Sequence, residues 1–242
     1  KKEFEKYMST RVGDHRDWTN AEKHVESNQD QVDRRWRFLE PHVYEGMNVL
    51  EIGCSSGFML NKFKENKCNP VGVEPSGEFL EFIKKNNFEA YQDISEVKGN
   101  FDLICHFFVF EHIGDPFFFL EQQMSLLNKN GLIIAEIPSA TDPLTSIYDI
   151  PAFEEFYWSI AHHFYYTPKS LKYVLDKMNL KYEIIPEQRY DLSNHMTWMM
   201  EGKPGGQKKY NNLFSKKLEE QYMQDLKDNW SCDTIFLKIF KS

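Results

Sequence analysis

A glycine-rich turn in the first quarter of the chain carries residues that could hold a ligand. The turn reads EIGCSSG over residues 51–57 and lies between a short apolar run and a stretch with helical spacing. Glycines let the backbone turn sharply, and N–H groups at the start of a helix attract anionic or polar ligand groups. We therefore expect a ligand site at this turn, with the Glu51 carboxylate at its edge.

Two known types of site could use such a turn. The dinucleotide fingerprint G-x-G-x-x-G fails here, because Ser55 and Phe58 occupy the positions of its second and third glycines. The nucleophile elbow of hydrolases, G-x-S-x-G, matches literally, with Ser55 as the nucleophile and His163 or His195 available as its histidine. An elbow normally follows several strands of a sheet, whereas this turn follows the first recognisable strand. A serine hydrolase therefore remains the alternative.

Strands that alternate with helices must position this turn. Seven short apolar or β-branched runs predict strands, at residues 47–52, 70–74, 88–92, 101–109, 131–137, 181–185 and 234–240. Helical spacing is found at residues 20–39, 58–65, 77–85, 115–127 and 168–178. This alternation indicates βαβ units. The expected fold is α/β, a Rossmann-like, mostly parallel seven-stranded sheet with helices on both faces.

The order of four motifs resembles the class I methyltransferases that use S-adenosylmethionine. The first motif of that family is acid-x-Gly-x-Gly-x-Gly; here Glu51, Gly53 and Gly57 match it and Ser55 replaces the middle glycine. Glu74 follows as the second acid, at the end of the next strand. The later motifs are FDLI at 101–104, VFEHIGDP at 109–116 and NGLIIAEIP at 130–138. The resemblance covers residues 45–187 and the final strand.

The resemblance implies S-adenosylmethionine as cofactor and a role for each matching residue. It places the methionine end at Glu51, Gly53, Ser55 and Gly57, the ribose hydroxyls at Glu74, the adenine at Asp93 and Ile94, and an aromatic contact at Phe107. Three of these residues could instead have a structural role without a ligand: Glu74 as a helix-capping acid, Glu51 in an ion pair at the strand end, and Asp93 as a loop residue. Phe108 departs from the family, because many members carry a polar residue there.

A hydroxyl acceptor must lose a proton during transfer, and histidine is the usual base near neutral pH. His163 lies in the segment 148–166, where eight of nineteen residues are aromatic. That segment is either an acceptor pocket or an apolar cover over the sheet edge. His195 lies in a polar insertion, residues 187–231, and is either a second candidate base or a solvated loop residue. His112 matches a family signature that orders the turn after a strand.

We expect no metal ion in the site. His162 and His163 are adjacent and diverge on a helix or a strand, so that one ion would not take both. The motif H-E-x-x-H is absent, and no pair of aspartates suggests a cation site.

Residues 1–45 form a predicted N-terminal helical lid, followed by one methyltransferase domain over 46–242 whose insertion at 187–231 covers the acceptor. Arg34 and Arg35 on the N-terminal helix are expected on a solvated face, with a cofactor or acceptor contact as the alternative.

Composition limits the partners. The chain has 29 Lys and Arg against 37 Asp and Glu, a net charge of −8, which argues against a nucleic-acid backbone or an anionic membrane as partner. Four scattered cysteines without a CxxC pair, and no apolar run of membrane-spanning length, predict a cytoplasmic protein. The expected function is O-methylation of a small polar acceptor, a sugar or nucleotide-linked surface-polysaccharide precursor. A cofactor-binding module without activity is a further alternative.

Overall fold

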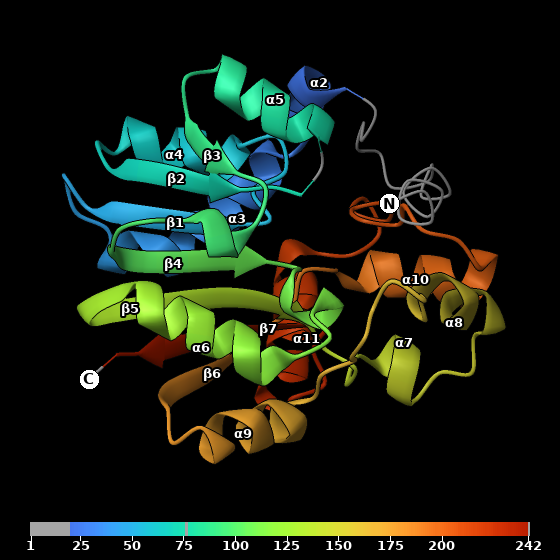
Figure 1. Cartoon of the computed structure of the whole chain (residues 1–242). Helices are drawn as coiled ribbons and strands as arrows, with labels where there is room; N and C mark the ends of the chain where they lie inside the picture. Colours follow the sequence, from blue (N-terminus) through green and yellow to red (C-terminus); the bar gives the residue numbers. More distant parts are fainter. Residues whose placement is uncertain (1–19, 76, 242) are drawn as a thin grey trace.

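The computed structural model describes residues 20–75 and 77–241, and Figure 1 shows a central sheet with helices on both sides. The sheet has seven strands in the order β3-β2-β1-β4-β5-β7-β6. β1 to β5 run parallel, and β7 runs antiparallel to both β5 and β6. The predicted mostly parallel seven-stranded sheet is therefore confirmed. The strands are β1 (Asn48–Ile52), β2 (Asn69–Val73), β3 (Glu89–Tyr91), β4 (Phe101–Phe107), β5 (Leu127–Pro138), β6 (Lys181–Glu187) and β7 (Thr234–Phe240).

The helices follow the predicted rhythm, with additions after residue 140. They are α2 (Ala21–Ser27), α3 (Gln29–Leu39), α4 (Phe58–Glu65), α5 (Gly77–Lys85), α6 (Pro116–Leu126), α7 (Pro143–Ser146), α8 (Pro151–Tyr157), α9 (Pro168–Lys177), α10 (Leu192–Glu201) and α11 (Lys216–Asp228), with short 3-10 turns η1 (Glu40–His42), η2 (Ile94–Glu96) and η3 (Phe110–His112). The single helix predicted over 20–39 is wrong in one respect. It breaks at Asn28, whose side-chain amide donates to the carbonyl of His24.

Local sequence signals explain where several helices begin. The Asn20 side chain accepts from the backbone N–H groups of Glu22 and Lys23, and the Asp115 side chain accepts from the N–H of Phe118. Thr167 and Ser170 form a capping box around the start of α9. Such side-chain caps satisfy N–H groups that the first helical turn leaves unpaired.

The order in which successive strands are added to the sheet reverses between β1 and β4. β1 pairs with β2 on one side and with β4 on the other, so the loops after β1 and β4 leave the same edge and diverge. In parallel α/β sheets this switch point is where ligands bind, beyond the carboxyl ends of the strands. Figure 1 shows α7, α8 and α10 gathered on the side toward which β4 points. The carboxyl ends of β1 and β4 thus lie at one edge of the sheet, with α7, α8 and α10 beside it.

The helix α3 packs into the core of the sheet. Its Val32, Trp36 and Leu39 share one apolar cluster with Val49 of β1 and Leu103 of β4. On the other face of the sheet, residues of α6 and α9 form a second cluster with β4, β5 and β7. α3 is therefore joined to the domain by buried apolar contact, and that it acts as a lid stays a prediction. Residues 1–19 of the predicted lid lie outside the described residues.

The segment after β6 is more buried than its polar composition indicates. It forms α10 and α11, and Ser193, His195 and Thr197 of α10 are at most 1% exposed. Trp198 of the same helix packs with Leu144 and Phe153 in a separate apolar cluster. The aromatic segment 148–166 contributes most of that cluster, and whether it covers the sheet edge or lines an acceptor pocket stays a prediction. That 187–231 covers an acceptor remains a prediction.

The expectation of a solvated face at Arg34 and Arg35 is wrong. Arg35 Nε lies 2.8 Å from Glu136 Oε2, and Arg34 Nη2 lies 2.5 Å from Glu136 Oε1. The Glu136 side chain is fully buried, and the side chains of Arg35 and Arg34 are 7% and 11% exposed. Burial alone would raise the pKa of Glu136, but the two guanidinium groups and Arg189 outweigh it and lower that pKa. Glu136 is therefore held ionised, and it ties α3 to the end of β5.

The described helices include none that is both long and apolar enough to cross a bilayer. The four cysteines, Cys54, Cys68, Cys105 and Cys232, are all buried and unpaired.

Removing the charge of Glu136 should lower the stability of the folded protein. Glu136→Gln leaves two buried guanidinium groups without their carboxylate, so we expect the free energy of unfolding to fall by about 3–5 kcal/mol. Urea denaturation followed by circular dichroism measures this loss. The control is Glu220→Gln, which removes an exposed pair with Lys216 and should change the free energy by less than about 1 kcal/mol. Equal losses in both variants would contradict the role of Glu136.

Candidate cofactor and acceptor site

The glycine turn after β1 adopts a backbone that side chains disfavour. Gly53, Ser55 and Gly57 have φ angles of 71°, 52° and 78°, in the left-handed region that glycine adopts most readily. A Cβ atom at Gly53 would lie 2.5 Å from Cγ2 of Val109, so the position has room only for glycine. The loop after β4, which carries Val109, therefore lies directly against the turn.

Glu74 lies at the same turn, at the end of β2. Its Oε2 atom accepts a hydrogen bond of 2.7 Å from the backbone N–H of Ser55, and the residue is 7% exposed. This bond joins the second acid of the sequence motif to the backbone of the glycine turn. The carboxylate stands where a bound ribose would lie by the family resemblance, and that role stays a prediction.

Glu51, the last but one residue of β1, has a buried carboxylate. The residue is 2% exposed, and its Oε2 atom has no hydrogen-bond partner in the part of the chain that the structure describes. Burial raises the pKa of Glu51 to about 8; Arg35 opposes this rise and Glu74 adds to it. A buried hydrogen-bond acceptor atom that has no described partner, beside a glycine turn, fits a cationic group of a ligand. The ammonium of S-adenosylmethionine is such a group, so the residues present fit this cofactor.

Two arginines flank the aromatic residues at the end of β4. The guanidinium carbon of Arg35 lies 4.5 Å from the ring centre of Phe107 and 5.7 Å from that of Phe108. The guanidinium carbon of Arg189 lies 4.6 Å from the ring centre of Phe108. Phe107 is buried and its described ring contact is with Arg35, and its contact with the cofactor stays a prediction.

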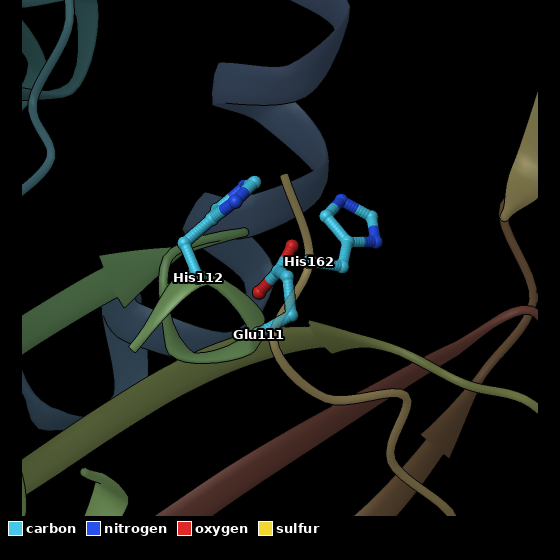
Figure 2. A group of neighbouring side chains, drawn as sticks. All are labelled: Glu111, His112 and His162. Atoms are coloured by element: carbon cyan, nitrogen blue, oxygen red, sulfur yellow. The ribbon is translucent and has the colours of Figure 1, made fainter. Parts of the chain in front are cut away.

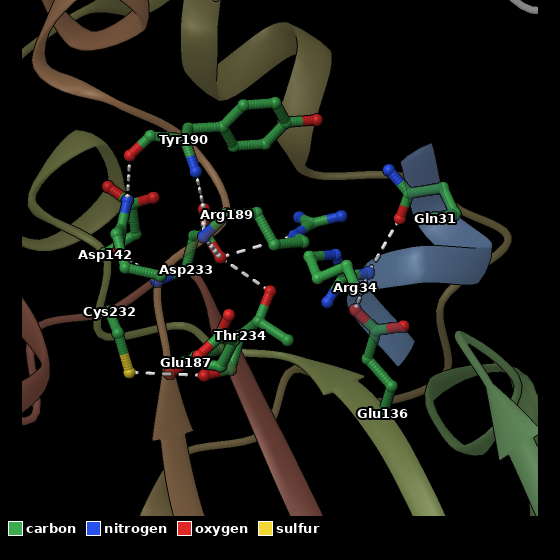
Figure 3. Close-up of polar contacts among 12 residues, drawn as sticks. Gln31, Arg34, Glu136, Asp142, Glu187, Arg189, Tyr190, Cys232, Asp233 and Thr234 are labelled. Carbon is green, nitrogen blue, oxygen red and sulfur yellow. Dashed lines mark hydrogen bonds and ion pairs between the residues drawn. The ribbon is translucent and has the colours of Figure 1, made fainter. Parts of the chain in front are cut away.

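Arg189 is a site residue that the sequence did not reveal. Its backbone N–H and its Nε both donate to Asp233, at the start of β7. Figure 3 shows this network, with Arg189 on Asp233 and Arg34 on Glu136. Nε and Nη1 of Arg34 are buried without a hydrogen-bond partner among the described residues. The strand ends therefore carry surplus hydrogen-bond donors of positive charge, and no local motif around residue 189 could have indicated them.

Asp93 and Ile94 follow β3. The Asp93 carboxylate accepts from the backbone N–H and the hydroxyl of Ser95, at 2.8 and 2.6 Å, and these bonds lower its pKa. Asp93 is exposed and caps η2, as the plain loop interpretation predicts, and Ile94 is partly buried against the core. Their contact with adenine stays a prediction.

The two candidate bases occupy different surroundings. His163 is exposed, its ring carbon Cε1 lies 3.9 Å from the position of a Cβ on Gly114, and its backbone N–H donates to the carbonyl of Glu111. His195 has no exposed surface. Its Nδ1 lies 2.5 Å from the Tyr222 hydroxyl, and burial lowers its pKa to about 4. The solvated-loop interpretation of His195 is therefore wrong, because the buried ring lies between Tyr222 and the Asp142 carboxylate, whose Oδ1 is 3.7 Å from Nε2.

Glu111, His112 and His162 form a cluster that sequence reasoning did not assemble. Their potential ligand atoms all lie within 4.8 Å of one another, and Figure 2 shows the three side chains converging. The Glu-His pair at 111–112 was the available signal, but the partner fifty positions later is brought there only by the fold.

The hydrolase alternative requires a histidine on Ser55. The hydroxyl of Ser55 has no hydrogen-bond partner in the described parts of the chain, and the histidine at the turn, His24, has its Nδ1 2.7 Å from the hydroxyl of Ser56 instead. The geometry therefore does not favour a nucleophile elbow.

Comparison with known proteins gives concordant matches. Residues 24–183 match the family described as "Methyltransferase domain". A ubiquinone biosynthesis O-methyltransferase of Nitrobacter winogradskyi is 28% identical over 112 residues, which are 43% of this chain and 42% of that protein. A tRNA U34 carboxymethyltransferase of Alteromonas mediterranea is 30% identical over 123 residues, 43% of this chain and 37% of that protein. The chain therefore spans less than half the length of these curated relatives.

The fold has solved relatives that match over nearly their whole length. A SAM-dependent methyltransferase from Archaeoglobus fulgidus aligns with a TM-score of 0.57 and 18% identity, covering 88% of this chain and 94% of that one.

Loss of the Glu74 carboxylate should weaken cofactor binding. A hydrogen bond to a charged group contributes about 1.5–3 kcal/mol, so Glu74→Ala should raise the dissociation constant of S-adenosylhomocysteine roughly ten- to hundred-fold. Isothermal titration calorimetry measures the change. The matched control is Glu81→Ala on the exposed side of α5, which should bind as the parent does. An unchanged constant in Glu74→Ala would mean that the ribose lies elsewhere.

The raised pKa of Glu51 predicts proton release on binding. Near pH 7 most molecules carry a protonated Glu51, because its pKa is about 8. A bound ammonium favours the ionised form, so binding should release about one proton and affinity should rise with pH from 6 toward 8. Calorimetry with S-adenosylhomocysteine in two buffers of different ionisation enthalpy counts the protons. Glu51→Gln should release none; equal release by this variant would exclude Glu51 as the group.

Proposed function

This chain belongs to the methyltransferase domain family, and from that premise we propose that it transfers a methyl group from S-adenosylmethionine to a hydroxyl oxygen of a small acceptor. The family match over residues 24–183 confirms the predicted methyltransferase class, and the seven-stranded fold shared with a SAM-dependent methyltransferase supports S-adenosylmethionine as the cofactor. The observation that carries the proposal for this chain is the buried Glu51 oxygen without a described partner, next to the Glu74 carboxylate at one glycine turn.

The chain's own residues bind, orient and exclude water. Glu51 pairs with the ammonium of the cofactor, Glu74 accepts from its ribose, and the turn at Gly53 lets the ligand approach the backbone. When bound, S-adenosylmethionine supplies an activated methyl group, so alignment and exclusion of water provide most of the catalysis. Nδ1 of His24 in α2 lies within hydrogen-bond distance of the hydroxyl of Ser56 in the turn. This contact supports a role of α2 in closing the site.

The acceptor lies beyond β4 and β5 in this proposal. Arg189 lies over the ring of Phe108 there, and Arg34 lies over the ring of Phe236 in β7. An acceptor with both an aromatic ring and an anionic group therefore fits this edge. One relative is named for O-methylation in ubiquinone biosynthesis and another for modification of tRNA. The net charge of −8 is unfavourable for tRNA. Neither name supports the predicted sugar or nucleotide-linked acceptor, so we propose a hydroxylated aromatic acid.

A panel of acceptors tests this choice. Purified protein, S-adenosylmethionine and one acceptor at a time are incubated, and methylated product and S-adenosylhomocysteine are measured by mass spectrometry. The acceptors are a dihydroxybenzoate, its uncharged amide, a nucleotide sugar and unmodified tRNA. We expect methylation of oxygen in the acid and at least ten-fold less in the amide. Product from tRNA or the nucleotide sugar alone would overturn the acceptor class, and labelling of Ser55 by a fluorophosphonate would support the hydrolase.

His163 is the proposed base, because it is exposed beside the loop after β4. A positioned general base contributes about a hundred- to ten-thousand-fold. His163→Ala should therefore lower turnover at least a hundred-fold, while affinity for S-adenosylhomocysteine stays within a few-fold of the parent. The comparison variant is His195→Ala, which should lower the melting temperature because its ring is buried against Tyr222. If His163→Ala keeps parental turnover, the base is another group.

A further inference from the structure

Three side chains outside the cofactor site have the composition of a metal centre. Glu111 and His112 belong to η3, and His162 lies in the loop between α8 and α9. Each offers one ligand atom, and these atoms lie within 4.8 Å of one another. Figure 2 shows the carboxylate of Glu111 between the two imidazole rings. Glu111 is 1% exposed and both histidines are half-buried, so the cluster is partly shielded from solvent.

Backbone hydrogen bonds hold the two segments of the cluster together. The N–H groups of His163 and Phe164 donate to the carbonyl of Glu111, at 2.8 and 3.2 Å. Nδ1 of His112 lies 2.8 Å from the carbonyl oxygen of Ala161. The residue on each side of His162 is therefore bonded to the Glu111–His112 pair. The donor atoms are positioned by the main chain as well as by their own side chains.

The hydrogen bond of His112 determines which of its nitrogens can bind a cation. A carbonyl oxygen only accepts, so Nδ1 carries the proton and a neutral ring presents its lone pair at Nε2. A histidine that donates one ring N–H to a backbone carbonyl and binds metal through the other nitrogen is the usual arrangement in metal sites. This bond is an observation independent of the cluster itself.

We propose that Glu111, His112 and His162 bind a divalent cation of the zinc class. Two imidazoles and one carboxylate form a donor set found in catalytic zinc sites, which keep a further position open for water or substrate. The expectation of no metal rested on the divergence of His162 and His163 and on the absence of an H-E-x-x-H motif and of an aspartate pair. In the structure only His162 of that pair belongs to the cluster, and the second imidazole is that of His112, fifty residues earlier in the sequence.

The cation would lie beside the methyl-transfer site. Val109, two residues before Glu111, contacts the glycine turn at Gly53. We infer, resting on the proposed function, that the open position takes the acceptor hydroxyl and lowers its pKa. The hydroxyl proton passes to a base, the oxygen lone pair forms the bond to the methyl carbon, and the electrons of the broken carbon–sulfur bond stay on sulfur. The products are the methyl ether, S-adenosylhomocysteine and a proton.

Metal binding is measured first without any activity. Chelator-treated full-length protein is titrated with ZnCl₂ by calorimetry, and with CoCl₂ by visible absorption, which reports coordination by nitrogen and oxygen ligands. We expect one site per chain. His112→Ala and His162→Gln should each weaken Zn²⁺ binding at least a hundred-fold, with unchanged circular dichroism. The matched control is His163→Ala, whose ring lies against Gly114, and which should bind Zn²⁺ within two-fold of the parent.

The outcomes separate this proposal from the proposed function. Absence of a stoichiometric Zn²⁺ site, or equal weakening in His163→Ala, would overturn the metal site even if methyl transfer is observed. A Zn²⁺ site of the expected pattern in a protein that does not bind S-adenosylhomocysteine would support the metal site and overturn the proposed function. Methyl transfer that proceeds at an unchanged rate in chelator-treated protein would contradict the role of the cation in activating the acceptor.

Discussion

The contact between Gly53 and Val109 is the constraint on which the site depends. Because Gly53 has no side chain, the loops that leave β1 and β4 can approach within van der Waals distance at the switch point of the sheet. One loop leads to Glu74 through the N–H of Ser55, and the other continues to Glu111 and His112. The proposed cofactor side and the proposed acceptor side thus meet where the Val109 side chain packs against Gly53, as in-line transfer requires.

Buried charge gives this edge its second property. Arg35 is bonded to Glu136 and acts electrostatically on Glu51 as well. Burial raises the pKa of Glu51 to about 8 although Arg35 opposes the rise, whereas Arg35 and Arg34 together hold Glu136 ionised. Near pH 7 most molecules therefore carry a protonated Glu51 beside an ionised Glu136. The same ion pair fastens α3 to the sheet, which links stability to the binding edge.

The sequence allowed most elements and the cofactor motif to be predicted, but the acceptor side was predicted poorly. Alternating apolar runs and local caps are short-range signals, and β1, β4 and α4 appeared within two residues of their expected positions. Arg34 and Arg35 were misjudged, because their polar character concealed a buried partner a hundred residues away in Glu136. His195 was misjudged for the same reason: only the packing of α10 on α11 places it against Tyr222.

By itself the sequence determined the order of strands and helices, the glycine turn and the two acids at the ends of β1 and β2. These depend on hydrophobic period, on backbone freedom and on residues close in the chain. The tertiary structure alone decided which distant polar residues meet: Glu136 with two arginines, Arg189 with Asp233, and His162 with the Glu111–His112 pair. A single sequence carries no record of such pairings, because they depend on how elements pack and not on local pattern.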